Sequence, residues 1–245
     1  MNYCILNGKK STMVKGLLIQ SLPPITKPLM RTRIEEVDGR DGDIITKLGY
    51  SAYNREMSIG LFGDYDLSEV AQYFDSEGEV IFSNELDKKY RYKILDEINF
   101  ERLGIFKQAI VTFHVQPFKY SSSDDRTNIL YANYYEKQII NYGNVIARPR
   151  WLIPASSSVN TTVSFSRVGS GLGTLNVNVN KNKDIIIDVE TKQAYEVASG
   201  TLVNRNISGD TDVLALEAGI NKMNVDIHSV AISSNFILYD LSRWI

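Results

Sequence analysis

The chain has 245 residues, with 27 lysine and arginine residues against 29 aspartate and glutamate residues, so its formal net charge is −2. Such a balance lacks the positive field by which proteins hold nucleic acid or acidic lipid. One cysteine and two histidines exclude an intrachain disulfide framework and a Cys/His zinc cluster.

The hydrophobic share of 43% is enough for real cores, and the length suits one large all-β domain or two of ordinary size. No apolar run approaches the roughly 20 residues of a membrane span. The first ten residues show no basic segment followed by an apolar one, so no signal peptide is visible. We therefore expect a soluble protein made in the cytoplasm.

The acidic turn Asp38–Asp43 (DGRDGD) is the first candidate metal site, since carboxylates on a glycine-rich loop can bind calcium. However, Arg40 stands where an EF-hand needs its second ligand, and Ile44–Ile45 begins a strand. We favour a tight turn whose glycines have positive φ.

The segment DYDLSEVAQYFDSEG predicts the one helix of the chain, at Leu67–Phe74. Asp66 and Glu69 fit a capping box, and Gly78 stands where a chain leaves a helix in the left-handed conformation. The apolar residues at helical spacing are Leu67, Val70, Ala71 and Phe74. A face this narrow is expected to lie against a sheet.

Most other segments alternate apolar and polar residues with period two, which predicts strands. The clearest is Ile110–Gln116, which places Val111, Phe113 and Val115 on one side and Thr112, His114 and Gln116 on the other. Other strands are predicted at Glu79–Phe82, Tyr90–Ile98, Leu175–Val179, Asp184–Val189, Met223–Ile227 and Ala231–Tyr239. About a dozen short strands favour sandwiches or barrels.

A domain boundary is predicted between about Tyr120 and Gly143. Pro117 is expected to end the preceding strand because it cannot donate to a ladder, and Ser121–Asp125 is a polar run. Asparagine and serine become common after Gly143. We predict a mainly β fold with domains 1–125 and 126–245.

Four tyrosines near this boundary could form a stacking surface for sugar or protein, and half-buried strand residues are an equal alternative. They are Tyr131, Tyr134, Tyr135 and Tyr142. Further along, Asn176, Asn178, Asn180 and Asn182 alternate on one strand, which we interpret as a solvated outer face.

Paired carboxylates could serve a glycosidase as acid and base or nucleophile. The available pairs are Asp184 with Asp188, Asp210 with Asp212, and Asp124 with Asp125. Strand-end and turn aspartates are common, so nothing favours catalysis over a structural role.

Other candidate groups also have structural interpretations. His114 fits an outward strand residue, His228 a turn, and Cys4 a small packed residue rather than a nucleophile. The glycine-rich segment 169–173 has strands on both sides instead of a helix N-terminus, so it predicts a hairpin rather than a phosphate loop. No catalytic, metal or cofactor motif is found, and we predict a protein that is not an enzyme and carries no cofactor.

Taken together, the N-terminal half resembles the distal tail proteins of long-tailed, non-contractile bacteriophages. The motifs are Leu6-Asn7-Gly8-Lys9, Gly16-Leu17, Pro23-Pro24, Val37 to Gly42, the single helix, Gly78 to Ser83, Lys89 to Tyr92, and Phe113 to Tyr120. The C-terminal half is similar to that family's galectin-like domain. Its motifs are Asn141-Tyr142-Gly143-Asn144, Arg148-Pro149, Asp184 to Asp188, Leu216 to Asn221, and Ser242-Arg243-Trp244.

The resemblance implies a β-sandwich or barrel-like N-terminal domain with one helix, followed by a galectin-like β-sandwich. It implies a hexameric ring at the virion tail tip, formed through the N-terminal domain during assembly in the host cytoplasm. The implied partners are the tail tube protein, the tape-measure protein, the tail-tip hub or tail-associated lysin and, where present, a receptor-binding protein. A central channel would let DNA pass, without membrane contact or sequence-specific nucleic-acid binding.

The galectin sugar motif, a His-Asn-Pro-Arg-type strand with a Trp and Glu pair, is not found. The segment Arg148 to Trp151 is only superficially similar to it and lies at a different place in the domain. The length leaves no room for an inserted carbohydrate-binding module, so host adhesion is expected to lie with a partner. Two alternatives remain: a carbohydrate-binding adhesion module for host cell-wall polysaccharide, and a glycoside hydrolase using Asp184 or Asp188.

Overall fold

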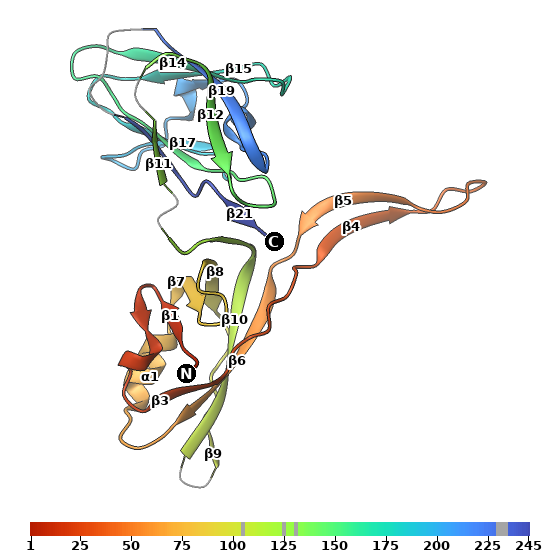
Figure 1. The fold of residues 1–245 in the computed structure, drawn as a ribbon, viewed down its shortest axis with the longest axis vertical. Coiled ribbons are helices and arrows are strands. Elements are labelled where there is room, and N and C mark those ends of the chain that lie inside the picture. Colours follow the sequence, from red (N-terminus) through yellow and green to blue (C-terminus); the bar gives the residue numbers. More distant parts are fainter. Residues whose placement is uncertain (104–105, 124–125, 130–131, 229–234) are drawn as a thin grey trace. The chain divides into compact units, whose positions relative to one another are not determined.

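The computed structural model describes residues 1–245 except 104–105, 124–125, 130–131 and 229–234. The fold is mainly β, as predicted, with one α-helix among the described residues (Figure 1). The chain divides into two compact units: Met1–Ser122 together with Ile245, and Ser123–Trp244. None of the helices in the described part of the chain is long and apolar enough to span a membrane.

The first unit is built on an antiparallel sheet with strand order β2-β1-β7-β8-β10-β6-β3, and β9 pairs with the start of β10. Its strands are β1 (Cys4–Leu6), β2 (Lys9–Lys10), β3 (Leu17–Ser21), β6 (Tyr53–Leu61), β7 (Glu77–Phe82), β8 (Lys88–Ile94), β9 (Glu101–Leu103) and β10 (Phe106–Ser121). A separate hairpin consists of β4 (Met30–Glu35) and β5 (Ile44–Tyr50).

The single helix, α1, spans Leu67–Phe74 as predicted and packs on the core of this unit. Its buried face is Val70, Tyr73 and Phe74. The predicted face was therefore partly wrong, because Leu67 and Ala71 are exposed and Tyr73 takes their place. The Tyr73 ring meets that of Phe74 edge-on at 4.9 Å, and its hydroxyl donates to the Lys9 carbonyl at 3.1 Å. That polar partner is what lets an aromatic hydroxyl enter the core.

Asp66 caps the N-terminus of α1, because its carboxylate accepts a hydrogen bond from the Ser68 amide at 2.8 Å. We expect Asp66→Ala to lower the free energy of unfolding by about 1 kcal/mol, the usual cost of losing such a cap. Urea denaturation followed by circular dichroism measures it. Asp64→Ala is the control, since that exposed carboxylate pairs with Lys15 outside the helix. Equal losses in the two variants would contradict a capping role.

Gly78 does not end the helix, contrary to the prediction. The residue that caps the C-terminus of the helix is Asp75, which is not left-handed, and Gly78 lies inside β7 with φ 138°. A Cβ on Gly78 would overlap the Asn7 side chain, with Asn7 Cγ 2.9 Å away. Glycine is therefore needed for a close approach between β7 and the β1–β2 turn.

Pro117 does not end its strand either. β10 runs from Phe106 to Ser121, and its register against β8 shifts between Val115 and Lys119. This bulge leaves Pro117 without a ladder partner on β8, so its missing N–H costs no hydrogen bond there. On β10 the predicted alternation is confirmed: Val111, Phe113 and Val115 are fully buried, and the residues between them are not.

The second unit consists of two five-stranded antiparallel sheets, in the orders β11-β20-β13-β16-β17 and β12-β19-β14-β15-β18. The first sheet contains β11 (Arg126–Ile129), β13 (Arg150–Ile153), β16 (Ile185–Asp188), β17 (Gln193–Glu196) and β20 (Phe236–Tyr239). The second contains β12 (Tyr134–Asn141), β14 (Thr161–Arg167), β15 (Thr174–Val179), β18 (Ile207–Ser208) and β19 (Gly219–Ile227). A short strand, β21 (Arg243–Trp244), follows near the chain end.

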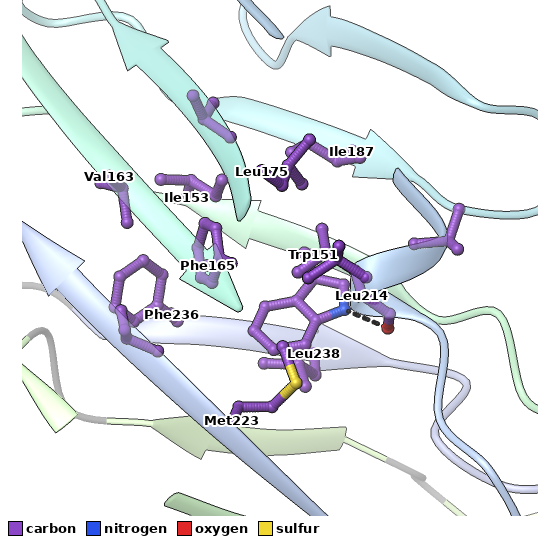
Figure 2. Close-up of a cluster of buried hydrophobic side chains, with 14 of the residues drawn as sticks. Trp151, Ile153, Val163, Phe165, Leu175, Ile187, Leu214, Met223, Phe236 and Leu238 are labelled. Carbon is purple, nitrogen blue, oxygen red and sulfur yellow. Dashed lines mark hydrogen bonds between the residues drawn. The ribbon is translucent and has the colours of Figure 1, made fainter. Parts of the chain in front are cut away.

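One continuous core lies between these two sheets and Figure 2 shows part of it. Trp151 is fully buried at its centre, where its indole N–H donates to the Leu214 carbonyl at 3.3 Å. Its ring meets Phe165 of the facing sheet edge-on at 5.4 Å, and Phe165 meets Phe236 at 5.8 Å. Alternating inward residues from two facing sheets define a β-sandwich.

Candidate functional site

The hairpin β4–β5, here called the arm, is the feature of the first unit that its core does not explain. It pairs with no other described strand, and Figure 1 shows it reaching away from the sheet of its unit. No residue from Met30 to Tyr50 is buried. An isolated two-stranded hairpin is at best marginally stable in water, so the arm lacks a stabilising surface within its own unit.

Apolar side chains of the arm face solvent. Ile34 and Ile45 are cross-strand partners on the same face, and they are 58% and 62% exposed. Leu48, beside the bulge between Arg31 and Thr32, is 54% exposed. Neighbouring exposed apolar residues outside a core are typical of a surface that meets another protein.

The tip of the arm is the predicted tight turn. Gly39 and Gly42 have φ of 79° and 77°, and the Arg40 amide donates to the Val37 carbonyl at 3.1 Å. Within the described part of the chain, no group of three or more His, Cys, Asp or Glu residues is arranged to hold a metal ion.

The base of the arm is packed tightly against the sheet, whereas the residues along the arm are not buried. Arg55 is 3% exposed, and its guanidinium donates to the Pro23 and Pro24 carbonyls at 3.3 and 2.9 Å. It lies over the rings of Phe82 and Tyr90, at 4.8 and 4.4 Å from their centroids. Buried cation–π contacts of this kind fix a side chain strongly. The chain entering the arm is thereby anchored to the sheet.

The candidate carboxylates serve turns and loops. Asp184 accepts from the Ala155 amide at 2.7 Å, and Asp188 accepts from the Glu190 and Thr191 amides. Asp210 accepts from the Asp212 amide, which with the nearby Lys192 lowers the pKa of Asp210. A lowered pKa is the wrong direction for a general acid. Asp124 and Asp125 lie outside the described residues.

The remaining candidates occupy ordinary structural positions. Burial raises the pKa of the Cys4 thiol to about 11, and its sulfur lies 3.7 Å from the Tyr73 hydroxyl, which confirms a packed residue. His114 Nδ1 lies 2.9 Å from the Asn54 amide oxygen on the outward side of β10. The segment 169–173 joins antiparallel β14 and β15, which confirms the hairpin.

The candidate tyrosines differ from one another. Tyr134 packs against the core of the sandwich, whereas Tyr135 and Tyr142 are 84% and 73% exposed. Tyr131 lies outside the described residues. Tyr135 borders a hollow of about 630 Å³ on the outer face of β12, β14, β15 and β19. The sequence left an exposed stacking surface and half-buried strand residues as equal alternatives, and the structure shows one of each kind, exposed Tyr135 and half-buried Tyr134. The hollow was not predicted, because it depends on how the strands pair.

Comparisons with known proteins identify the fold. No family model and no curated protein matches the chain. Solved structures of phage tail-tip proteins do share its fold. The crystal structure of SPP1 Dit, described as a paradigm of the hub adsorption apparatus in phages infecting Gram-positive bacteria, matches with a TM-score of 0.70 and 15% identity over 100% of both chains.

Two structures of the phage P2 baseplate in its activated conformation also match. The one with calcium gives a TM-score of 0.56 and 14% identity over 100% of this chain and 98% of that chain. The one with strontium gives 0.54 and 13% over 97% of each. At the level of fold, the resemblance to distal tail proteins is confirmed.

Proposed function

We propose that this chain is a structural, non-enzymatic protein of a bacteriophage tail tip, which assembles into a hexameric ring. The ring would connect the tail tube and tape-measure protein to the tail-tip hub or lysin and the adhesion apparatus, around a channel for DNA. The fold shared with a phage Dit protein and with baseplate chains supports this role.

The arm is the observation that carries the proposal. A hairpin without buried residues, with Ile34 and Ile45 exposed side by side, gains stability when another copy covers it. An arm held at its root and docked on a neighbour makes a heterologous contact, and such a contact generates a ring when the rotation between successive copies closes. We assign ring formation to residues 1–125 and a galectin-like sandwich to residues 126–245.

The charge balance is compatible with a DNA channel. A formal net charge of −2 gives the chain no general attraction for the phosphate backbone. DNA in transit through a ring should not be retained on its wall.

Ile45→Asp should weaken assembly, because a carboxylate would have to be desolvated at the arm contact. We expect light scattering coupled to size exclusion to give six times the 27.7 kDa chain mass for the wild type and smaller species for the variant. Ile220→Asp is the matched control, since Ile220 is 64% exposed on β19 against 62% for Ile45 on β5.

The control should keep the wild-type mass. A wild-type protein that stays monomeric at every accessible concentration, alone and with its tail tube protein, would contradict the ring. Equal disruption by the two aspartate variants would contradict the role of the arm.

A further inference from the structure

The outer face of the sheet β12-β19-β14-β15-β18 is a second surface whose composition requires explanation. Its register places Ser164 between Asn176 and Asp226, and Ser166 between Thr174 and Asn224. Because serine and threonine are short, the face is hollowed there beside the exposed Tyr135 ring. None of the described residues that line this hollow is a lysine or arginine.

The polar side chains of the hollow are held in place by one another. Ser164 donates to the Asn176 side-chain oxygen at 2.7 Å, and its oxygen lies 3.0 Å from His228 Nε2. The Asn224 amide nitrogen donates to the Ser166 oxygen at 3.3 Å. A surface whose rotamers are already fixed loses little entropy when a ligand binds.

The backbone at the edge of the hollow is unusual. β12 has a bulge between Tyr134 and Lys137, where Glu136 is left-handed with φ 54°. Asn224 accepts from the Glu136 amide at 2.9 Å, and Lys222 donates to the Glu136 carboxylate at 2.7 Å. Bulges of this kind re-aim a side chain, and here Tyr135 is exposed at the rim while Tyr134, half-buried, packs against the core.

Hydrogen-bonding capacity remains in the hollow after these contacts. The Asp226 carboxylate is 63% exposed, with His228 at 3.6 Å. Ser166 accepts from Asn224 and still has a hydroxyl proton to donate. Acceptors and donors of this kind match vicinal hydroxyls, and the exposed tyrosine ring offers an apolar surface to one face of a sugar ring.

We propose that this hollow binds a neutral saccharide, with Tyr135 against the sugar ring and Ser166 and Asp226 on its hydroxyls. The negative carboxylate without a lining cation disfavours acidic sugars. The proposal does not rest on ring assembly.

The test uses the full-length protein. A neutral glycan array selects ligands, and maltotetraose and chitotetraose are then titrated by NMR, with tetragalacturonate as the acidic control. We expect Tyr135→Ala to weaken binding of a neutral tetrasaccharide about tenfold or more, the effect of losing one aromatic contact. Asp226→Asn should weaken binding of the neutral tetrasaccharide by a smaller factor. It should also reduce the preference for neutral over acidic sugars. Tyr142→Ala, which removes a tyrosine 73% exposed outside the hollow, should have no effect.

Both tyrosines are exposed, so these variants are expected to fold, and circular dichroism checks this. The proposal is overturned if no neutral glycan is retained on the array and neither tetrasaccharide shifts resonances at millimolar concentration. It is also overturned if Tyr142→Ala weakens binding as much as Tyr135→Ala, or if tetragalacturonate binds more tightly than the neutral sugars.

Discussion

Trp151→Ala should destabilise the second unit by about 3–5 kcal/mol, the range for removing a fully buried aromatic side chain. The indole is fully buried, contacts Phe165 of the facing sheet, and donates to the Leu214 carbonyl. Its loss leaves a cavity between the two sheets and a buried carbonyl without its donor. Calorimetry and denaturation followed by circular dichroism measure the effect.

Trp151→Phe separates the two contributions. This variant keeps an aromatic ring near Phe165 but removes the donor to the Leu214 carbonyl. We therefore expect it to lower the free energy of unfolding by a smaller amount, about 1–3 kcal/mol. An alanine variant within about 1 kcal/mol of the wild type would show that the indole is not a core residue of the sandwich.

Gly143→Ala is the second substitution for which we expect a large effect. It should lower the free energy of unfolding of the second unit by roughly 2–4 kcal/mol, because the added methyl group overpacks the site. A Cβ on Gly143 would overlap the Arg243 carbonyl oxygen and lie 2.5 Å from the Arg243 nitrogen. That carbonyl also accepts from the Asn144 and Val145 amides at 3.0 and 3.3 Å. The backbone therefore cannot move away without breaking the bonds that join this turn to β21.

Gly169→Ala is the matched control for Gly143→Ala. Gly169 has φ 77°, and a Cβ added there would meet nothing within 4 Å, so its substitution tests backbone conformation alone. We expect it to cost about 1–2 kcal/mol. If the two glycine variants unfold at the same denaturant concentration, close approach at Arg243 is not what requires glycine at position 143.

The sequence alone identified elements that depend on local pattern. The alternation in Ile110–Gln116 predicted which side chains of β10 are buried, and the spacing around Asp66 predicted the helix with both ends correct. In each case the signal lies within a few neighbouring residues, and burial follows from the period of the element.

The errors concern residues whose role is set by a distant partner. Gly78 follows a helix in the sequence, but its neighbour in space is Asn7. Pro117 interrupts a pattern, yet the strand continues because the bulge opposite β8 accommodates it. Neither partner can be found from a local window.

The candidate surfaces were foreseen to different extents. The predicted strand at Ile44–Ile45 exists, but nothing in its sequence marked it as leaving the sheet. Tyr135 was recognised as a possible contact residue. Its hollow arises from the pairing of four strands and from a bulge, which only the register shows.

The contrast between the anchored root and the uncovered length of the arm has a thermodynamic consequence. A hairpin without buried residues should open locally at little cost, so its amide protons in the free subunit should exchange with solvent much faster than those of β6 and β10. Docking would then order the arm, and part of the contact energy would offset its lost chain entropy. Association between subunits would be weaker than the buried area suggests, which lets misplaced subunits dissociate before a closed assembly forms.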